Sequence, residues 1–334
     1  MKVIKQSIGI DVSKDSLACC IGYFDQDRNE IFTKVQSFRN DLDGFKALLK
    51  WVKSHEPCND IWYTMEATGV YYENLAYWLL ENDLNVSVLL PSKVNHYSKT
   101  LEIKTKTDAV DARILAKMGL ERKMKKWAIP SPLMREVRIL TRELKETKAK
   151  LVVAKNQLHA KMHAYKTTKS TLRRVKKIIR LLESQTVEIE AELRVLVMED
   201  SLLSDKIEKL ESIPGISFLT IISLLGETNG FALFSSSKQL VSYAGLDIKH
   251  KQSGMRVGKS KISKQGNSFI RNALYMPALC SSRYNPDLKI FYNRINENKP
   301  CKKIGVTAVA RKLLVLVYTL WKNDTEYIPN FKAA

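Results

Sequence analysis

Two aspartates three residues apart carry the strongest chemical signal in this chain. Asp108 and Asp111 lie in the run Lys104-Thr-Lys-Thr-Asp-Ala-Val-Asp111, where the pattern predicts the start of a helix. Positions i and i+3 share one helix face, so the two carboxylates would lie close together and repel each other unless a cation lies between them. Hard oxygen ligands of this kind select Mg²⁺ or Mn²⁺.

Two further acids are placed to join this pair. Asp11 closes the apolar run Ile8-Gly-Ile-Asp11, and Glu66 closes the run Ile61-Trp-Tyr-Thr-Met-Glu66, so each lies near the tip of a predicted strand. We predict that Asp11, Glu66, Asp108 and Asp111, the acidic quartet, form one metal site. Two cations held there would clamp a phosphate, which is typical of phosphodiester chemistry. Four unrelated surface acids are the alternative interpretation.

The charge of the chain indicates a polyanionic partner. The 334 residues carry a net charge of +20, with a pI near 9.6, which is typical of proteins that bind DNA or RNA. No apolar run reaches the ~18–20 residues of a membrane-spanning helix, and the N-terminus enters a strand-like segment without a signal peptide. The five cysteines show no zinc-ligand spacing, so we expect reduced thiols. We therefore expect a cytoplasmic protein.

Residues 1–130 have the pattern of an α/β domain. The order strand, strand, strand, helix, strand, helix, strand, helix is that of an RNase H-like fold, in which metal carboxylates lie on the first strand, the fourth strand and a late helix. The acidic quartet matches those three places. The predicted strands cover 3–10, 16–23, 30–38, 61–65 and 86–90, and the predicted helices 41–55, 70–82 and 108–120.

The sequence pattern of residues 131–205 predicts two long helices. Neither glycine nor proline occurs between Pro132 and Pro214, and two heptad series with alternating steps of three and four are typical of coiled coils. The polar segment 165–170 separates the series, so the helices either fold back on each other or pair between subunits. Their cations are either a solvated face or a nucleic-acid contact. The series are Leu133, Val137, Leu140, Leu144, Thr147, Leu151, Ala154, Leu158 and Leu172, Val175, Ile179, Leu182, Thr186, Ile189, Leu193, Leu196.

Residues 206–334 form the predicted third domain, mostly helical. The run Ile213-Pro-Gly-Ile216 between two helices resembles a helix-hairpin-helix, with a plain turn between helices as the alternative. A basic, glycine-containing stretch follows at 243–267, where backbone can approach a phosphate and cations can neutralise it. The candidate nucleic-acid contacts are Lys251, Arg256, Lys259, Lys261, Lys264 and Arg271, together with Arg113 on the helix of the two aspartates.

The motifs in combination resemble the DEDD transposases of insertion-sequence family one-ten, which are related to the Piv DNA invertases. The matching runs are Gly-Ile-Asp11-Val-Ser, Met-Glu66-Ala-Thr-Gly, Lys-Thr-Asp108-Ala-Val-Asp111-Ala, Ile-Pro-Gly-Ile, and Gln-Ser253-Gly followed by Ile-Ser-Lys-Gln-Gly-Asn. The resemblance implies a RuvC-like N-terminal domain, a coiled-coil linker and a C-terminal transposase domain. It also implies Ser253 as a nucleophile beside the metal-bound quartet, and a structured guide RNA that pairs with target and donor DNA.

A serine hydroxyl is a weak nucleophile at neutral pH and needs a base or a metal. Forming a protein–DNA bond would conserve the phosphodiester energy that rejoining requires. Ser260 and Ser263 are the alternatives to Ser253, which without the resemblance is best interpreted as a turn residue. From these features we predict a transposase or site-specific recombinase, acting as a homo-oligomer without a membrane, and the resemblance implies a location at the prokaryotic nucleoid.

Three other functions fit part of the pattern. A RuvC-like structure-specific endonuclease would need only the acidic quartet. A non-catalytic nucleic-acid-binding scaffold would need only the basic surfaces. An actin-like sugar kinase shares the Gly-Ile-Asp strand but requires further glycine-rich phosphate loops that the chain does not contain.

Overall fold

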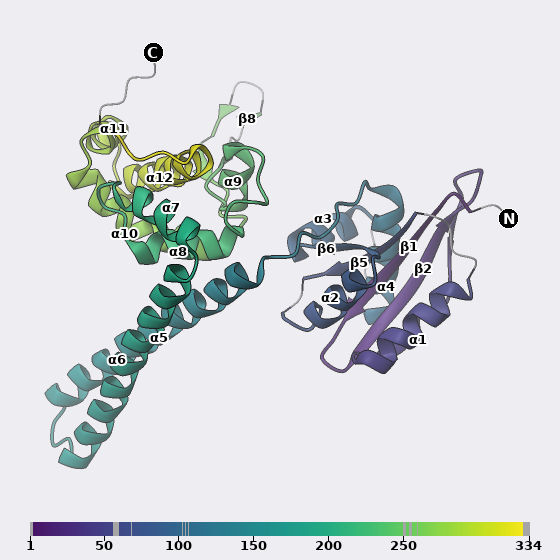
Figure 1. Cartoon of the computed structure of the whole chain (residues 1–334), viewed down its shortest axis with the longest axis horizontal. Helices are drawn as coiled ribbons and strands as arrows, with labels where there is room; N and C mark the ends of the chain where they lie inside the picture. The colour runs from purple at the N-terminus through teal and green to yellow at the C-terminus, as the bar shows by residue number, and fades with distance from the viewer. Residues whose placement is uncertain are drawn as a thin grey trace. The chain divides into compact units, whose positions relative to one another are not determined.

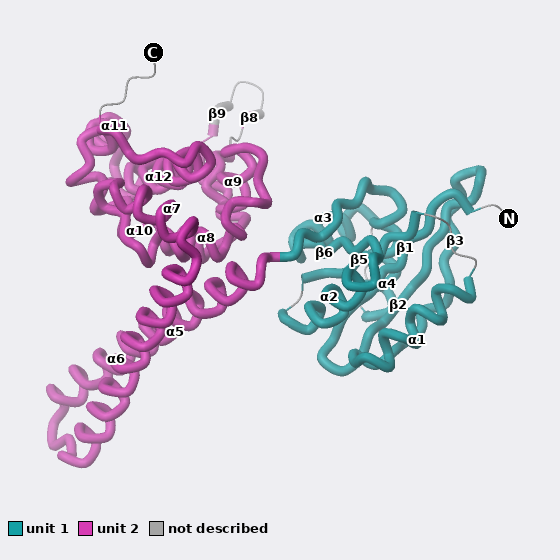
Figure 2. Tube along the Cα trace, in the orientation of Figure 1, with its two compact units in different colours: residues 1–129 teal, residues 130–334 magenta. Residues whose placement is uncertain are grey.

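The computed structural model describes residues 3–55, 60–67, 69–101, 103, 105, 107–249, 252–253, 256–258 and 260–329. The chain divides into two compact units, residues 1–129 and residues 130–334 (Figures 1 and 2). The first is α/β with a mixed sheet and the second is mostly helical, which confirms that part of the predicted fold class.

The first unit is built on a six-stranded sheet with the order β3-β2-β1-β5-β6, in which β4 also pairs with β2. The hairpin of β1 and β2 is antiparallel, whereas β5 runs parallel to β1 and β6 parallel to β5. The strands are β1 (Lys5–Val12), β2 (Ser16–Phe24), β3 (Glu30–Phe32), β4 (Gln36–Arg39), β5 (Ile61–Glu66) and β6 (Asn85–Leu89).

The predicted third strand over 30–38 is divided in two. β3 pairs with one end of β2 and β4 with the other. Between them, the Thr33 hydroxyl accepts a hydrogen bond from the Ile21 amide at 3.1 Å, and the Thr33 amide donates to the Ile21 carbonyl at 2.9 Å. The Thr33 side-chain oxygen thus replaces a backbone carbonyl as the acceptor between the two strands. The regular strand pairing is therefore interrupted at Thr33.

The two faces of the sheet differ in side-chain size. One face carries Ile8, Ile10, Ile21 and Met65, all fully buried, in a core shared with the two helices that cover it, α1 (Leu42–Lys53) and α2 (Glu73–Glu81). The other face carries small residues and is covered by α4 (Asp108–Glu121).

One helix of this unit was not predicted. The sequence analysis treated Pro91 as the end of the preceding strand, but Pro91 is the first residue of α3 (Pro91–Thr100). Proline suits this position because its fixed φ fits a helix and its missing N–H would have no partner within the helix.

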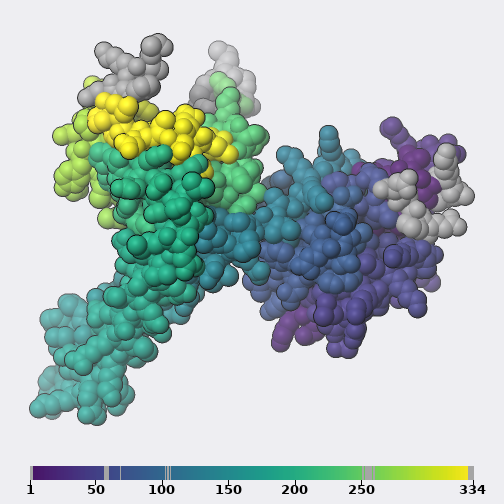
Figure 3. All heavy atoms as spheres, viewed as in Figure 1, coloured from purple at the N-terminus to yellow at the C-terminus, as the bar shows by residue number. Residues whose placement is uncertain are grey.

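The second unit begins with two long helices, α5 (Pro132–His163) and α6 (Lys169–Met198), which pack against each other as a hairpin within one chain. Val137, Leu144, Ile189 and Leu193 are buried in the seam, so the heptad positions are used inside the hairpin. Lys148 pairs with Glu190 at 2.7 Å and Lys155 with Glu183 at 2.8 Å across it. The tip of the hairpin extends away from the remaining helices of this unit (Figure 3).

The remaining helices share one core with the base of this hairpin. Val137 and Leu193 from the hairpin belong to the same buried cluster as Ile221 and Leu225 of α8. These helices are α7 (Ser201–Glu211), α8 (Phe218–Thr228), α9 (Ser237–Tyr243), α10 (Ser268–Tyr284), α11 (Pro286–Asn296) and α12 (Lys303–Asn323).

Among the described residues, α12 is the one helix that is long and apolar enough to cross a membrane by length and composition. The search for apolar runs in the sequence did not identify it. Val309, Leu313, Leu314 and Val317 are fully buried within the second unit. The apolar character of α12 is therefore used in the protein core, where it packs against α10 and α11.

Candidate active site

The small-residue face of the sheet lets α4 approach the backbone of β1 very closely. A Cβ atom added at Gly9 would lie 2.1 Å from both the Ala112 carbonyl oxygen and the Ala116 amide nitrogen. One added at Gly119 would lie 1.9 Å from the Ser7 hydroxyl. Only glycine fits at these two positions while helix and strand stay where they are.

These contacts fix the direction in which α4 runs over β1. Ser7 lies beneath Gly119, near the end of the helix, and Gly9 lies beneath Ala112 and Ala116. Alternate residues of a strand share one face, so Asp11 follows Ser7 and Gly9 on the face that α4 covers. The next residues of the helix in that direction are those of its first turn, which contains Asp108 and Asp111.

Glu66 reaches the same end of this face from β5. Thr64 pairs with Gly9, and its hydroxyl lies 2.8 Å from the Cβ position at Gly119. Two residues further along β5, Glu66 is therefore on the same face and level with Asp11. The fold thus places the four acids of the quartet at one end of one face of the sheet.

The donor set of the quartet suits a hard divalent cation. All four residues offer carboxylate oxygens; Asp11, Glu66 and Asp111 are half-buried and Asp108 is exposed. Within the described ranges, no three His, Cys, Asp or Glu side chains lie close enough together to form a metal group as they stand. Asp108 and Asp111 also lie at the N-terminus of α4, whose dipole favours negative charge.

Both ends of α4 are held in place. At its start, the Thr107 side chain accepts a hydrogen bond from the Val110 amide at 3.3 Å, an N-cap that the sequence analysis missed although Thr-Asp before a helix is a common signal. At its end, the Lys5 amine donates to the carbonyls of Leu120 at 2.5 Å and Arg122 at 3.2 Å. Burial lowers the pKa of Lys5.

The cations on α4 have partners within the first unit. The Lys117 amine pairs with Glu30 and, at 3.0 Å, with Glu121, whose carboxylate also accepts a hydrogen bond from the Tyr97 hydroxyl at 2.6 Å. Burial and this hydrogen bond raise the pKa of Tyr97. The Arg113 guanidinium, a predicted nucleic-acid contact, is exposed and lies 4.8 Å from the centre of the Phe32 ring.

Ser253 lies in the second unit on a small nested β-hairpin rather than in an irregular loop. The outer pair is β7 (Ile248–Lys249) with β10 (Lys261–Ile262), and the inner pair is β8 (Gln252–Ser253) with β9 (Arg256–Val257). The inner pairing places Ser253 opposite Arg256, next to the connecting turn. Lys251 and Lys259 lie outside the described residues, as do the side chains of Ser253 and Arg256.

The base of this serine hairpin, residues 248–262, is closed by hydrogen bonds. The Ser263 hydroxyl donates to the Asp247 carboxylate, and the Asn267 amide donates to the Tyr243 carbonyl at 2.7 Å. One nitrogen of Arg271 donates to the carbonyls of Ala244, Gly266 and Asn267 at 2.9, 3.1 and 3.2 Å. Arg271, predicted as a nucleic-acid contact, therefore binds the backbone at the hairpin base, whereas the side chains of Lys261 and Lys264 are exposed.

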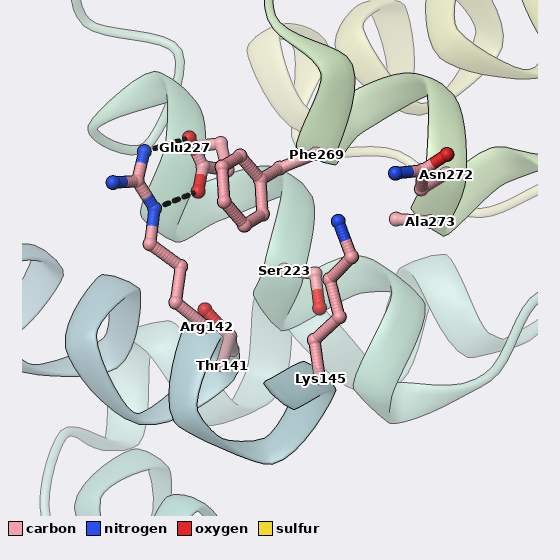
Figure 4. Close-up of a pocket in the computed structure, with 8 residues that line it drawn as sticks. All are labelled: Thr141, Arg142, Lys145, Ser223, Glu227, Phe269, Asn272 and Ala273. Carbon is pink, nitrogen blue, oxygen red and sulfur yellow. Dashed lines mark hydrogen bonds and ion pairs between the residues drawn. The ribbon is translucent and has the colours of Figure 1, made fainter. Parts of the chain in front are cut away.

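A buried carboxylate joins the base of the serine hairpin to the long helix α5. Glu227 on α8, 4 % exposed, accepts two hydrogen bonds from Arg142 of α5, at 2.7 and 2.9 Å (Figure 4). It also accepts one from the Asn267 amide group at 2.6 Å, and Asn267 caps the start of α10. Sequence reasoning missed this network because Arg142 and Glu227 are 85 residues apart.

Arg142 and Glu227 also border a cavity of about 270 Å³. In Figure 4 the Lys145 side chain extends into it between Phe269 and Asn272. The Phe269 ring lies 4.1 Å from the Lys145 amine and 4.3 Å from the Arg142 guanidinium. Thr141, Arg142, Lys145, Ser223, Glu227, Phe269, Asn272 and Ala273 line the cavity.

Removal of Arg142 is expected to destabilise the second unit by about 3 kcal/mol, because it leaves Glu227 buried without its cation. This value lies at the low end for a broken buried pair, since the Arg142 side chain is 41 % exposed. Urea unfolding of Arg142→Ala measures it. The matched control is Lys155→Ala on the same helix, whose pair with Glu183 is about half exposed on both sides and should cost at most about 1 kcal/mol. Equal effects of the two substitutions would contradict the buried-pair interpretation.

Comparison with known proteins identifies the family. A family model described as "Transposase", for DEDD transposases of the IS110 type, matches residues 8–167, and a second, described as "Transposase IS116/IS110/IS902 family", matches residues 207–293. The chain is 30% identical over 328 residues to the pilin gene-inverting proteins of Moraxella bovis and Moraxella lacunata, covering 97% of this chain and 98% of each relative. It is also 27% identical to the transposase for insertion sequence element IS1111A of Coxiella burnetii, over 36% of this chain and 34% of that protein. The chain therefore belongs to the IS110 family of DEDD transposases and DNA-inverting recombinases, enzymes that cut and rejoin DNA.

Proposed function

We propose that this enzyme cuts DNA at a two-metal site built by Asp11, Glu66, Asp108 and Asp111, and rejoins it through Ser253 as a covalent nucleophile. The single observation that carries the proposal is the register of three elements, β1, β5 and the first turn of α4, which puts the sequence positions of these four acids toward the same end of one sheet face. Strand cleavage and joining by Asp108→Asn and Ser253→Ala variants test it.

The arrangement of the first unit supports a RuvC-like assignment. Three antiparallel strands, β3, β2 and β1, are followed by β5 and β6 in parallel, which is the strand order of RNase H-like domains. The acids come from the first strand, from the strand beside it and from the helix that crosses them. Membership in a DEDD transposase family supports divalent-metal dependence in general, and the all-oxygen donor set favours Mg²⁺ or Mn²⁺.

Each acid has a distinct task in this proposal. Asp11 and Glu66 stand on paired strands and would hold their oxygens rigidly, while Asp108 and Asp111 would close the site from the helix. When bound there, divalent cations would stabilise negative charge on the attacking and leaving oxygens of the scissile phosphate.

Ser253 would make the reaction reversible. Its hydroxyl oxygen would attack the phosphorus, a carboxylate of the quartet would take the hydroxyl proton, and the DNA sugar oxygen would leave and gain a proton. The serine–phosphate ester keeps the energy of the broken bond, so a new DNA hydroxyl can attack it and free the serine. The position of Ser253 in the inner strand pair, opposite Arg256, supports this assignment, because an arginine would attract the phosphate that the hydroxyl attacks.

The partners proposed for this enzyme are donor DNA, target DNA and a structured guide RNA. The net charge of +20 and the exposed Lys261 and Lys264 on or beside the serine hairpin support a polyanionic partner. A homo-oligomer and a cytoplasmic, nucleoid-associated location remain predictions. Much of the heptad seam that suggested self-association is buried within one chain, so a partner copy that binds this folded hairpin would contact its outer surface.

Neutralising the lysines of the serine hairpin is expected to weaken the salt dependence of nucleic-acid binding. Each lost phosphate contact should reduce the slope of log K against log salt by about 0.9 on duplex DNA. The triple variant Lys259→Gln, Lys261→Gln, Lys264→Gln should therefore lose roughly 2.7 from the slope, measured by fluorescence anisotropy across a salt series.

The matched control for this triple variant replaces three exposed lysines of the first unit, Lys46, Lys50 and Lys53 on α1, by glutamine. Both variants lower the net charge equally, so only a local contact distinguishes them. Equal slopes for the two variants would mean that the serine hairpin does not bind phosphate.

A further inference from the structure

The helix that carries Asp108 and Asp111 meets β1 at Gly9 directly through backbone atoms. At Gly9 the helix and strand backbones come so close that no Cβ fits between them. Thr64, Ser7 and Gly9 from the sheet and Ala112, Ala116 and Gly119 from the helix make this small-residue contact.

Gly9 is not required for its backbone conformation. It lies in the middle of β1, pairs with Cys20 on one side and Thr64 on the other, and does not have a positive φ. Glycine weakens the interior of a strand, where a β-branched residue is more usual. The close approach of α4 therefore explains glycine at this position.

The contact lies directly beside the acids of the quartet. Gly9 is two residues from Asp11 on the same strand face, and Ala112, whose carbonyl it meets, follows Asp111. A Cβ at residue 9 would lie 2.1 Å from two backbone atoms, so the helix would have to move by on the order of 1 Å to restore contact distances. Metal–ligand distances tolerate only about 0.2 Å.

We propose that Gly9 and Gly119 are positioning residues for the metal site: they set the distance of α4 from the sheet and thereby the spacing of Asp108 and Asp111 from Asp11 and Glu66. This inference rests on the proposed metal-binding function of the quartet. It adds two glycines to the four proposed ligands. These glycines determine the distance between the carboxylates on α4 and those on the sheet.

The experiment measures Mn²⁺ affinity of the full-length protein by electron paramagnetic resonance, alongside DNA cleavage and thermal unfolding. Gly9→Ala is expected to weaken Mn²⁺ binding and cleavage by about 10–100-fold, as for other residues that orient metal ligands. Nucleic-acid binding should stay unchanged, because it depends on other surfaces.

The matched control is Gly22→Ala, in the same sheet and facing the same helix. There the added Cβ would meet only side-chain carbons of Leu120 and Phe32, both at 2.9 Å, and these can turn aside. Gly22→Ala is therefore expected to bind Mn²⁺ as the unaltered protein does, even if its melting temperature falls.

A rescue experiment separates positioning from simple damage. The added Cβ of Gly119→Ala would lie 1.9 Å from the Ser7 hydroxyl, 2.8 Å from the Thr64 hydroxyl and 2.9 Å from the Ser7 Cβ. Ser7→Gly removes the two Ser7 atoms and leaves the Thr64 contact, so it should recover part of the Mn²⁺ affinity lost in Gly119→Ala. The same substitution should not rescue Gly9→Ala, whose added carbon meets backbone.

Two outcomes would overturn the inference while leaving the metal site intact. The first is a Gly9→Ala variant that folds and binds Mn²⁺ as tightly as the unaltered protein, while Asp11→Asn has lost Mn²⁺ binding. The second is a Gly119→Ala variant with unaltered Mn²⁺ affinity; this result would be decisive even if Gly9→Ala does not fold. Unaltered affinity in Asp11→Asn itself would instead remove the metal site on which the inference rests.

Discussion

Asp108→Asn is expected to lower DNA strand cleavage by about 10³-fold or more while the protein stays folded and binds nucleic acid normally. A cation at a phosphoryl centre supplies several kcal/mol of transition-state stabilisation, and each 1.4 kcal/mol corresponds to a tenfold rate. Asp108 is exposed at the start of α4, so its loss should leave the core packing intact. Cleavage of a supercoiled plasmid that carries the element ends measures the rate.

The control for this substitution is Asp43→Asn. Asp43 is also an exposed acid in the first turn of a helix, α1, but α1 covers the opposite face of the sheet. Cleavage should not change. Chelation of divalent cations should reproduce the loss seen in Asp108→Asn, and added Mg²⁺ or Mn²⁺ should restore it. Cleavage by Asp108→Asn at the normal rate would remove the argument for the metal site.

Ser253→Ala is expected to abolish both the covalent protein–DNA adduct and DNA joining, with a rate loss on the order of 10⁴-fold or more, as for other enzymes that lose a nucleophile. The fold should be preserved, because Ser253 lies in a two-residue strand near the turn of the hairpin rather than at its base. Mass spectrometry of the peptide attached to DNA identifies the modified residue.

Ser263→Ala is the matched control in the same segment. The Ser263 hydroxyl already donates to Asp247 at the hairpin base, so we expect it to stabilise the hairpin rather than attack DNA. This variant should still form the adduct. An adduct on Ser260, on Ser263 or on a tyrosine would move the assignment, and efficient cleavage by Ser253→Ala without any adduct would favour a simple endonuclease.

The sequence was sufficient to predict the elements that carry the acidic quartet. Apolar runs identified β1 and β5, and the Thr-Asp-Ala-Val-Asp pattern identified the start of α4, because these signals depend on neighbouring residues alone. Period-two alternation then determines which residues of a strand share a face. The expectation that the four acids lie toward one end of one sheet face follows from those local rules together with the strand order.

Other features depend on partners far away in the chain, which local patterns do not encode. The split of the third strand results from the Thr33 hydroxyl bonding to Ile21 on another strand. The nested pairing of β7 to β10 consists of two-residue strands, too short for an alternating pattern to be recognised. The need for glycine at position 9 likewise comes from Ala112 and Ala116 of α4, which are distant in the sequence.

The pair between Arg142 and Glu227 has a consequence for how this family can diversify. The arginine belongs to the projecting helical hairpin and the glutamate to the helices that support the serine hairpin, and both parts share one core. Exchanging the helical hairpin with that of a relative that lacks an arginine at position 142 would leave Glu227 buried without its cation. Evolution of the hairpin is therefore tied to that of its neighbours, so chimeras should be viable when the crossover leaves this pair within one parent.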